Sequence, residues 1–180
     1  LDFLKTGKEE VREVDTGIVA FSKKFRGMPK DITIIDVGTG SGCIAITLAL
    51  ELSVMPSGVE APKIIATDIS GDALEVARKN AKRHNVLDQI DFTVGNWKVE
   101  TVADPELAEW GNFLVVSNPP YIPEGESLPP DVSEYEPHEA LFAGEGGMDV
   151  LRPLYKECRN HPNCVGVVLE LREDQIRELE

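Results

Sequence analysis

Five short runs of residues, each apolar on both faces, constrain the fold of this chain more than any other feature. They are residues 32–37, 63–68, 90–94, 113–117 and 165–170. Such runs are typical of strands in a parallel sheet whose two faces are both covered by helices. Helical patterns lie between and after them, at residues 42–52, 72–84, 150–158 and from 173 onward. The alternation predicts an α/β, doubly wound domain with a mostly parallel sheet and right-handed crossovers.

Local signals refine these elements. Ser70 is placed to cap the helix over 72–84, because a serine hydroxyl accepts a hydrogen bond from an N–H group of the first turn. Pro153 falls within the first turns of 150–158 and weakens that helical pattern. Residues 123–149 are rich in Pro, Gly and Glu. They are too long for an idle connection, so we expect them to line a site.

The composition limits the classes of function. The chain has 180 residues, enough for one domain with a substantial core, and a formal net charge of -14. An acidic surface repels phosphate backbones, so direct nucleic-acid binding is disfavoured, and the basic run 78–84 is predicted to be the solvated face of a helix. Three cysteines without metal-like spacing argue against a disulfide framework and fit a reducing compartment. No window approaches ~18 uninterrupted apolar residues, so we expect no membrane span. We therefore expect the protein to be located in the cytoplasm or in an organellar matrix.

A glycine-rich loop at residues 36–42 (Asp-Val-Gly-Thr-Gly-Ser-Gly) follows the first predicted strand and opens a helix. Glycines there permit tight turning and close approach of the backbone to a ligand, and the helix start attracts an anionic group. The dinucleotide fingerprint needs a glycine at position 43, where this chain has Cys43, and no Walker lysine follows. The spacing argues against nicotinamide cofactors and nucleoside triphosphates. It favours S-adenosyl-L-methionine, which has a carboxylate but no phosphate.

Polar and aromatic residues follow the next two strands. Asp68 ends the second strand, where it is placed to accept hydrogen bonds from both ribose hydroxyls of a nucleoside. The alternative for Asp68 is a helix-capping or turn residue. Asn96 and Trp97 follow the third strand after Gly95, and they could bind the edge and the face of adenine. An ordinary core position is the alternative for Trp97.

The fourth strand ends in Ser117-Asn118-Pro119-Pro120-Tyr121. A residue before proline is pushed toward an extended backbone, and proline fixes φ and has no N–H. The result is a rigid rim with an amide side chain, a free carbonyl and an aromatic ring. We expect the Asn118 side-chain oxygen and the Pro119 carbonyl to accept the two hydrogens of a planar –NH2 group, and Tyr121 to stack on its face. The alternative is a proline-rich loop in which Tyr121 is a packing residue.

Together these residues resemble one family. Residues 36–42, 66–70 (Ala-Thr-Asp-Ile-Ser) and 116–122 (Val-Ser-Asn-Pro-Pro-Tyr-Ile) look like the protein-(glutamine-N5) methyltransferases, the HemK/PrmC family, which modify the glutamine of the Gly-Gly-Gln loop in peptide chain release factors. Residues 135–149 (Tyr-Glu-Pro…Ala-Leu…Gly…Gly…Asp) and 169–175 (Leu-Glu…Asp-Gln) fit as well. The Asn-Pro-Pro-Tyr motif alone is shared with adenine-N6 methyltransferases, whereas the block at 135–149 is more particular to the glutamine enzymes.

The resemblance implies a Rossmann-like class I S-adenosyl-L-methionine-dependent methyltransferase fold. Residues 31–180 are then the catalytic domain, and residues 1–30 a connector to a missing helical domain. The last two strands of the sheet are expected to be missing as well, which would leave an open edge. The resemblance implies that the partner is a release factor. It implies S-adenosyl-L-methionine as the cofactor, S-adenosyl-L-homocysteine as the product, and no requirement for a metal.

The resemblance also assigns roles to single residues. Catalytic roles fall to Asn118, Pro119 and Tyr121. Cofactor binding falls to Asp36, Gly38, Thr39, Gly40, Ser41, Gly42, Asp68, Ile69, Asn96, Trp97 and Asn118. Substrate binding falls to Asn118, Pro119, Pro120, Tyr121 and Glu136. The chain departs from the family at Asn96, where an Asp is usual before the Trp, and at residues 14–17, where a longer Arg-Pro-Glu/Asp-Thr-Glu stretch is reduced.

Two other functions stay open at this point. An adenine- or cytosine-amino methyltransferase acting on DNA or RNA would use nearly the same chemistry, since an exocyclic base amine is also planar. A base-flipping enzyme should, however, carry a positive groove, which the acidic charge opposes. A non-catalytic methyltransferase-like binding domain is the other alternative. The departures at Asn96 and residues 14–17 fit it, whereas the glycine loop, Asp68 and the Asn-Pro-Pro-Tyr motif argue against it.

Overall fold

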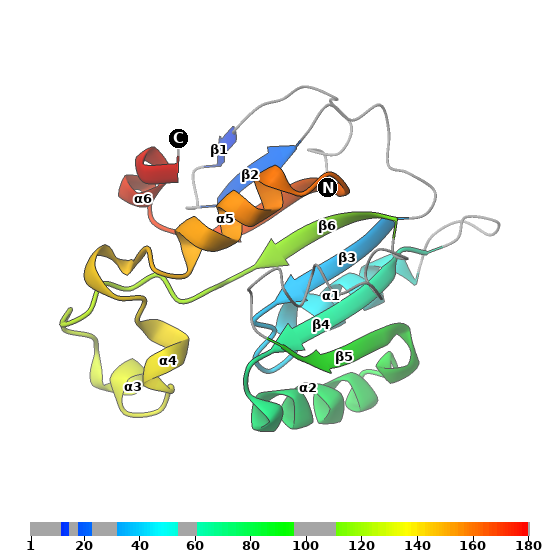
Figure 1. The fold of residues 1–180 in the computed structure, drawn as a ribbon. Coiled ribbons are helices and arrows are strands. Elements are labelled where there is room, and N and C mark those ends of the chain that lie inside the picture. The colour runs from blue at the N-terminus through cyan, green and yellow to red at the C-terminus, as the bar shows by residue number, and fades with distance from the viewer. Residues whose placement is uncertain (1–11, 15–17, 23–31, 54–60, 96–110, 180) are drawn as a thin grey trace.

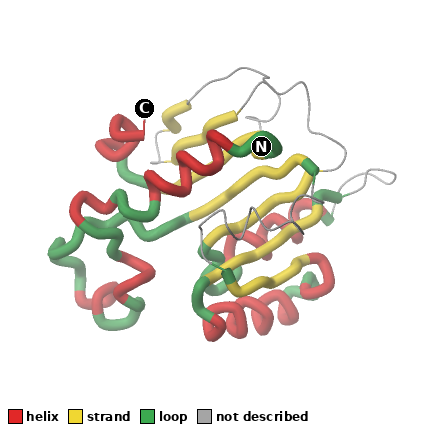
Figure 2. Tube along the Cα trace, in the orientation of Figure 1, coloured by secondary structure: helices red, strands yellow, loops and turns green. Residues whose placement is uncertain are grey.

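A seven-stranded sheet organises the molecule (Figures 1 and 2). The computed structural model describes residues 12–14, 18–22, 32–53, 61–95 and 111–179. The strands are β1 (Arg12–Val14), β2 (Ile18–Ser22), β3 (Ile32–Val37), β4 (Lys63–Asp68), β5 (Ile90–Val94), β6 (Asn112–Ser117) and β7 (Cys164–Glu170). Their order is β1-β2-β7-β6-β3-β4-β5. The five strands from β7 to β5 run parallel, whereas β2 pairs antiparallel with both β1 and β7.

Helices cover both faces of the parallel part of the sheet, as the sequence predicts. On one face, α1 (Cys43–Leu52) and α2 (Gly71–Arg83) share a core with β4 and β5. On the other face, α5 (Leu151–Asn160) and α6 (Glu173–Leu179) share a core with β3, β6 and β7. All six residues of β3 are buried between these layers. Each fully buried Ile, Leu or Val side chain contributes roughly 1.5–3 kcal/mol to this packing.

The five predicted strands match β3 to β7 within one residue at each end. Ser70 caps α2 as expected, because its hydroxyl accepts a hydrogen bond of 3.2 Å from the Ala73 N–H. The helix α5 forms despite Pro153, which is its third residue. At that position the backbone N–H has no partner within the helix, so a proline removes no hydrogen bond.

The outer edge of the sheet differs from the expectation. Residues 18–22 of the predicted connector form β2, and β2 pairs along β7 from Ile18 opposite Glu170 to Ser22 opposite Gly166. The strand β7 is therefore paired on both sides, so the open edge expected from missing strands does not fall on β7. A three-residue strand followed by a five-residue strand has no periodic pattern long enough to be read from sequence.

Residues 123–149, which we call the lobe, stand beyond the carboxyl ends of β3, β4 and β6 (Figure 1). The lobe contains α3 (Pro130–Ser133), α4 (His138–Leu141) and a 3-10 helix, Glu145–Gly147. A single bridge between Ile122 and Phe142 closes its base. In chain order the lobe connects β6 to α5, so it is fixed to the body at both ends.

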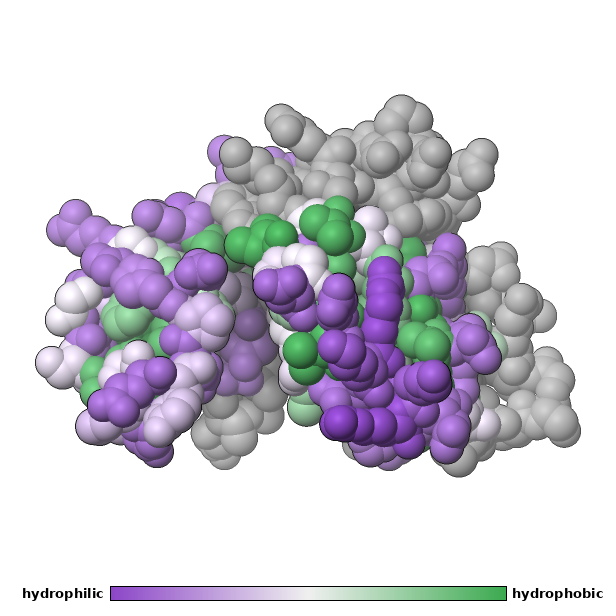
Figure 3. Space-filling model, turned by 90° about the horizontal axis from the view of Figure 1, so that it is seen from below, coloured by the Kyte–Doolittle hydropathy of each residue, from purple (hydrophilic) through white to green (hydrophobic). Residues whose placement is uncertain are grey.

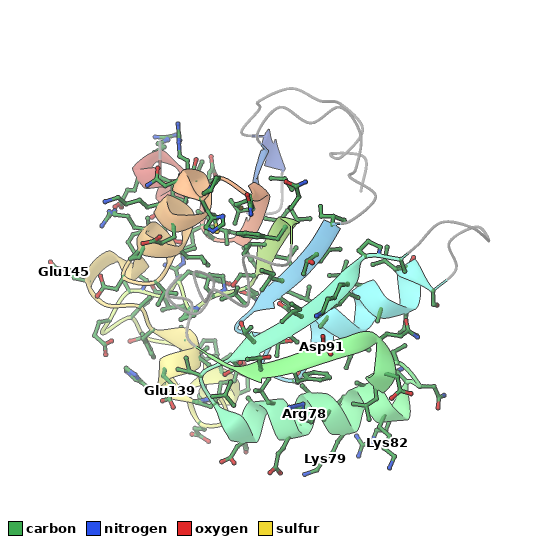
Figure 4. The ribbon with its side chains drawn as sticks, turned by 45° about the vertical axis from the view of Figure 1, so that its right-hand side comes forward. Arg78, Lys79, Lys82, Asp91, Glu139 and Glu145 are labelled. Atoms are coloured by element: carbon green, nitrogen blue, oxygen red, sulfur yellow. The ribbon has the colours of Figure 1, made fainter. Side chains whose placement is uncertain are left out.

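The basic run at residues 78–84 is the solvated face of α2, as predicted. All of its charged residues are exposed, and Lys79 and Lys82 point away from the sheet (Figure 4). The surface over α2 is strongly hydrophilic (Figure 3). Arg78 also donates a hydrogen bond of 3.0 Å to the Phe92 carbonyl and so ties α2 to β5. Among the helices that the structure describes, none has the length and apolar character needed to cross a membrane.

Candidate active site

The glycine loop connects the carboxyl end of β3 to the start of α1. Gly38 and Gly40 have positive φ angles of 69° and 55°, and a Cβ built on either would meet no atom within 4 Å. The backbone at both positions therefore faces open space. Gly42 differs, since a Cβ there would lie 3.0 Å from the Ile46 side chain and 3.1 Å from Ala77 Cβ. Gly42 permits close packing of α1 against α2.

Asp36 lies beneath the glycine loop and holds it in place. Its Oδ2 accepts hydrogen bonds from the Thr39 hydroxyl at 2.6 Å and from the Ala45 N–H at 3.0 Å. The side chain is fully buried, and its Oδ1 has no hydrogen-bond partner among the described residues. Burial raises the pKa of this carboxyl from 3.8 to about 6, although the Thr39 hydrogen bond opposes the shift. The charge of Asp68 adds a smaller upward contribution to the same pKa.

This raised pKa predicts a specific pH dependence of stability. The folded protein binds the Asp36 proton more tightly than the unfolded chain does. The resulting stabilisation is complete below the unfolded value of 3.8 and is lost as the pH rises through about 6. We expect the free energy of unfolding of wild type, relative to Asp36→Asn, to fall by about 2.4 kcal/mol between pH 4 and pH 7.5. Urea unfolding of both proteins at the two pH values measures this difference. A constant difference would contradict the account.

Asp68 is the last residue of β4 and links three segments at the sheet edge. Its Oδ2 accepts a hydrogen bond of 2.8 Å from the Gly40 N–H, and its Oδ1 accepts one of 2.9 Å from the Ser70 N–H. Its backbone carbonyl accepts the Gly95 N–H at 2.9 Å, which joins the ends of β4 and β5. Ile69, the next residue, is 58% exposed.

The Asn-Pro-Pro-Tyr segment leaves the end of β6 beside the glycine loop. The Ser117 hydroxyl donates a hydrogen bond of 2.6 Å to the Val37 carbonyl, which fixes the start of this segment against β3. Asn118 is exposed and Pro119 is buried. Tyr121 packs against the core formed with α5 and α6, and its hydroxyl donates a hydrogen bond of 3.3 Å to Glu170. Burial, together with the Glu170 carboxylate, raises the pKa of Tyr121 and keeps its hydroxyl protonated.

Two cavities meet at Asn118, Pro119 and Pro120, which line both of them. The smaller cavity, of about 220 Å³, also contains Asp68 and Ile69. The larger, of about 520 Å³, also contains Tyr121 and Glu136. Gly38, Gly40 and Ala140 line both as well. The structure thus places Asp68 and Ile69, predicted to bind cofactor, in the smaller cavity and Tyr121 and Glu136, predicted to bind substrate, in the larger. Asn118, Pro119 and Pro120, predicted to bind substrate, line both.

The remaining predicted site residues divide into three groups. Thr39 and Ser41 line the larger cavity. Asp36 and Gly42 line neither cavity; Asp36 supports the loop from below and Gly42 packs between helices. Asn96 and Trp97 lie outside the described residues. Their predicted contacts with adenine stay predictions.

The lobe contributes cavity residues that sequence reasoning had not singled out. Glu139 and Pro137 line the smaller cavity, and Val132 lines the larger. Glu139 lies on the side of the lobe that faces the sheet, whereas Glu145 lies on its outer side (Figure 4). The length of residues 123–149 had indicated that they line a site, and this prediction is confirmed. The individual residues carry no sequence signal of their own.

Comparisons with known proteins identify relatives of this chain. A methyltransferase domain family model matches residues 29–106. The release factor glutamine methyltransferase of Chlorobaculum tepidum is 49% identical over 117 residues, which are 63% of this chain and 36% of that protein. The same enzyme of Geobacter sulfurreducens is 34% identical over 154 residues, 84% of this chain and 49% of that protein. A bifunctional methyltransferase of Rickettsia typhi is 39% identical over 149 residues, 81% of this chain and 26% of that protein.

Solved structures support the fold. The hMettl16 catalytic domain, in complex with the MAT2A 3'UTR hairpin 1, superposes with a TM-score of 0.52 at 18% identity, over 82% of this chain and 54% of that one. At that identity the likeness concerns the fold alone, and it confirms the α/β class I methyltransferase architecture. The chain spans about a quarter to a half of the length of the three curated relatives named above.

Proposed function

We propose, from the premise that this chain belongs to the family of the release factor glutamine methyltransferases, that the whole protein methylates a release factor. The methyl group would pass from S-adenosyl-L-methionine to the side-chain amide nitrogen, N5, of the glutamine in the Gly-Gly-Gln motif. One observation carries the proposal: Asn118, Pro119 and Pro120 line both a cavity that contains Asp68 and a cavity that contains Tyr121 and Glu136. A methyl donor in the first cavity and an amide in the second would meet at Asn118.

The residues of the smaller cavity fit S-adenosyl-L-methionine. Gly38 and Gly40 present backbone to open space, so nothing hinders a close approach of the ligand. The N-terminus of α1, where Cys43 and Ile44 line the adjoining larger cavity, provides the positive end of a helix dipole, which favours a carboxylate. Both Asp68 carboxylate oxygens already accept one backbone hydrogen bond each, and each retains a lone pair for a ribose hydroxyl. Ile69 offers an exposed apolar side chain beside this position.

The Asn-Pro-Pro segment fits a carboxamide. The described residues leave the Asn118 side chain without a hydrogen-bond partner, so its oxygen is available as an acceptor. The fixed φ angles of the two prolines restrict how far the Pro119 carbonyl can move relative to that oxygen. Two acceptors of this kind would take the two N–H groups of a primary amide and turn its nitrogen lone pair toward the smaller cavity.

A carboxamide nitrogen is a poor nucleophile, so alignment is the main contribution that this chain can make. S-adenosyl-L-methionine supplies a methyl group on an electron-deficient sulfonium. As the new N–CH3 bond forms and the S–CH3 bond breaks, positive charge develops on the amide nitrogen. The Asn118 oxygen and the Pro119 carbonyl would stabilise that charge. One amide proton then leaves to water, and the products are N5-methylglutamine and S-adenosyl-L-homocysteine.

The charge around the larger cavity favours a protein over a nucleic-acid substrate. Glu136 lines that cavity, Glu139 lines the smaller one, and the lobe contains no lysine or arginine. Carboxylates at these places would repel the phosphates on either side of a flipped base. The basic residues of α2 do not compensate, since none of them lines either cavity.

A labelling experiment tests the proposed function. The whole protein is incubated with S-adenosyl-L-methionine labelled in its methyl group, together with a release factor, double-stranded DNA or structured RNA in separate reactions. We expect the release factor to acquire label and both nucleic acids to remain unlabelled. A release factor in which the Gly-Gly-Gln glutamine is replaced by glutamate is the matched control. Label on nucleic acid, or equal label on the control protein, would contradict the proposal.

A further inference from the structure

We propose that Gln175 of α6 is a positioning residue for methyl transfer, and that it acts by fixing the backbone of Tyr121. This inference rests on the proposed function, since it concerns the same acceptor site. Gln175 lies 54 residues after Tyr121 in the chain, on the helix that follows β7. It lines neither cavity. Any effect on catalysis must therefore pass through the residues that it holds.

Gln175 is a buried polar side chain whose hydrogen-bonding capacity is largely used. It is 2% exposed. Its Nε2 donates a hydrogen bond of 2.8 Å to the Tyr121 carbonyl and lies 3.2 Å and 3.4 Å from the carbonyls of Gly146 and Gly147. Its Oε1 accepts a hydrogen bond of 3.0 Å from the Arg172 N–H. An NH2 group has two hydrogens, so one serves Tyr121 and the other is shared between the two glycine carbonyls.

The surrounding residues fix the orientation of this amide. A reversed side chain would set its NH2 against the Arg172 N–H and its oxygen against three carbonyls, which is unfavourable at every contact. Because Gly147 has no side chain, its backbone can lie close to both the Tyr121 carbonyl and the Gln175 amide. A Cβ at Gly147 would lie 2.1 Å from the Tyr121 carbonyl oxygen and 2.8 Å from Gln175 Nε2. The glycine, the glutamine and the Tyr121 carbonyl therefore form one tightly packed arrangement.

The segment between β7 and α6 holds the acceptor site at two further points. Glu170, the last residue of β7, accepts the hydrogen bond from the Tyr121 hydroxyl. The Arg172 guanidinium donates two hydrogen bonds to the Glu126 carboxylate, at 2.7 Å and 2.6 Å. Tyr121 is thus held at its hydroxyl and at its carbonyl, and the start of the lobe is held five residues later. Of these anchors, the Gln175 bond is the one made to the backbone of Tyr121 itself.

A hydrogen bond to the backbone of Tyr121 restricts rotation about ψ in the Asn-Pro-Pro-Tyr segment, which the prolines alone do not restrict. Proline fixes φ at positions 119 and 120 but leaves ψ free to rotate. Ser117 holds the segment at its start through the Val37 carbonyl. Gln175 holds it at its end, so the Pro119 carbonyl lies between two fixed points. Without the second point, the Pro119 carbonyl and the Tyr121 ring can shift relative to Asn118, and alignment of the amide nitrogen is lost.

The test measures catalysis and backbone mobility in the same variant. Gln175→Met keeps the approximate shape of the side chain and removes both N–H donors and the acceptor. In the whole protein, with a release factor as substrate, we expect kcat to fall about 10- to 100-fold. The Kd for S-adenosyl-L-homocysteine should change less than about 3-fold, because Gln175 does not line the cavity of Asp68. Amide hydrogen exchange at Ile122, Glu124 and Gly147 should accelerate at least about 10-fold.

Two variants of α6 serve as controls. Ile176→Val removes buried packing from the same helix, and Glu178→Gln weakens its 2.6 Å contact with Arg152 on α5. Both should leave kcat and the exchange of these amides unchanged. Unchanged exchange in Gln175→Met, or faster exchange with unchanged kcat, would overturn the positioning role. If wild type transfers no methyl group to a release factor, the proposed function fails, and the exchange measurement still decides whether Gln175 holds the segment.

Discussion

Replacement of Asn118 by alanine is expected to lower kcat for release factor methylation by about 10²- to 10³-fold. The variant loses one of two acceptors that orient the amide nitrogen and stabilise the charge that develops on it. Asn118 is exposed, and the described residues make no hydrogen bond to its side chain, so the fold should not change. Single-turnover kinetics measures the effect on methyl transfer, and calorimetric titration of S-adenosyl-L-homocysteine measures the effect on cofactor binding. We expect the Kd for that ligand to change less than about 3-fold.

Asn112→Ala is the matched control for this variant. Asn112 is also exposed and lies at the opposite end of the same strand, β6. It lines neither cavity, so its replacement should leave kcat unchanged. An equal loss of cofactor affinity and of kcat in Asn118→Ala would contradict an orienting role. It would indicate instead that Asn118 mainly shapes the cavity of Asp68.

The second large effect is expected at Asp68. Asp68→Ala removes the carboxylate that would accept the two ribose hydroxyls, and a hydrogen bond to a charged group contributes about 1.5–3 kcal/mol. The Kd for S-adenosyl-L-methionine should rise about 100-fold. At saturating cofactor, kcat should be reduced far less, because Asp68 does not line the cavity that contains Tyr121. Isothermal titration and steady-state kinetics measure the two quantities.

Asp68 also has a structural role that this experiment must separate. Its carboxylate accepts the Gly40 and Ser70 N–H groups, so alanine leaves both donors unpaired. Ser70→Ala provides the comparison, since it removes the cap of α2 at a cost of about 1 kcal/mol in stability and keeps the carboxylate. If Ser70→Ala weakened cofactor binding as much as Asp68→Ala does, the ribose assignment would be wrong. Unchanged affinity in Asp68→Ala would contradict it as well.

The sequence predicts the elements whose signals are local. The five parallel strands were predicted from runs apolar on both faces, and the structure buries all of β3. In β5, at the edge of the sheet, only Ile90 is buried. The Ser70 cap follows from residue type and position alone, and the structure contains it. Asp68 and Asn118 were each predicted to lie at the carboxyl end of a strand, and such ends meet at one edge of a parallel sheet. Both line the smaller cavity.

Other features depend on contacts that the sequence does not express. The helices α3 and α4 have four residues each, too few for a periodic pattern. The strand β2 is defined by its pairing with β7, some 150 residues away in the chain. Gly42 was read as a ligand-binding glycine, yet a Cβ there would press on Ala77 of α2. Gln175 meets the Tyr121 carbonyl only because α6 and the lobe fold against the same end of β7.

The most direct test of the central claim is the position of the transferred methyl group. Release factor is reacted with the whole protein and S-adenosyl-L-methionine, digested, and analysed by tandem mass spectrometry. The claim that Asn118 and Pro119 orient a carboxamide predicts one added methyl on the side-chain nitrogen of the Gly-Gly-Gln glutamine, and none when Asn118→Ala is used for the same short reaction. A methyl group on any other residue, or an unmodified glutamine after prolonged reaction with wild type, would contradict it.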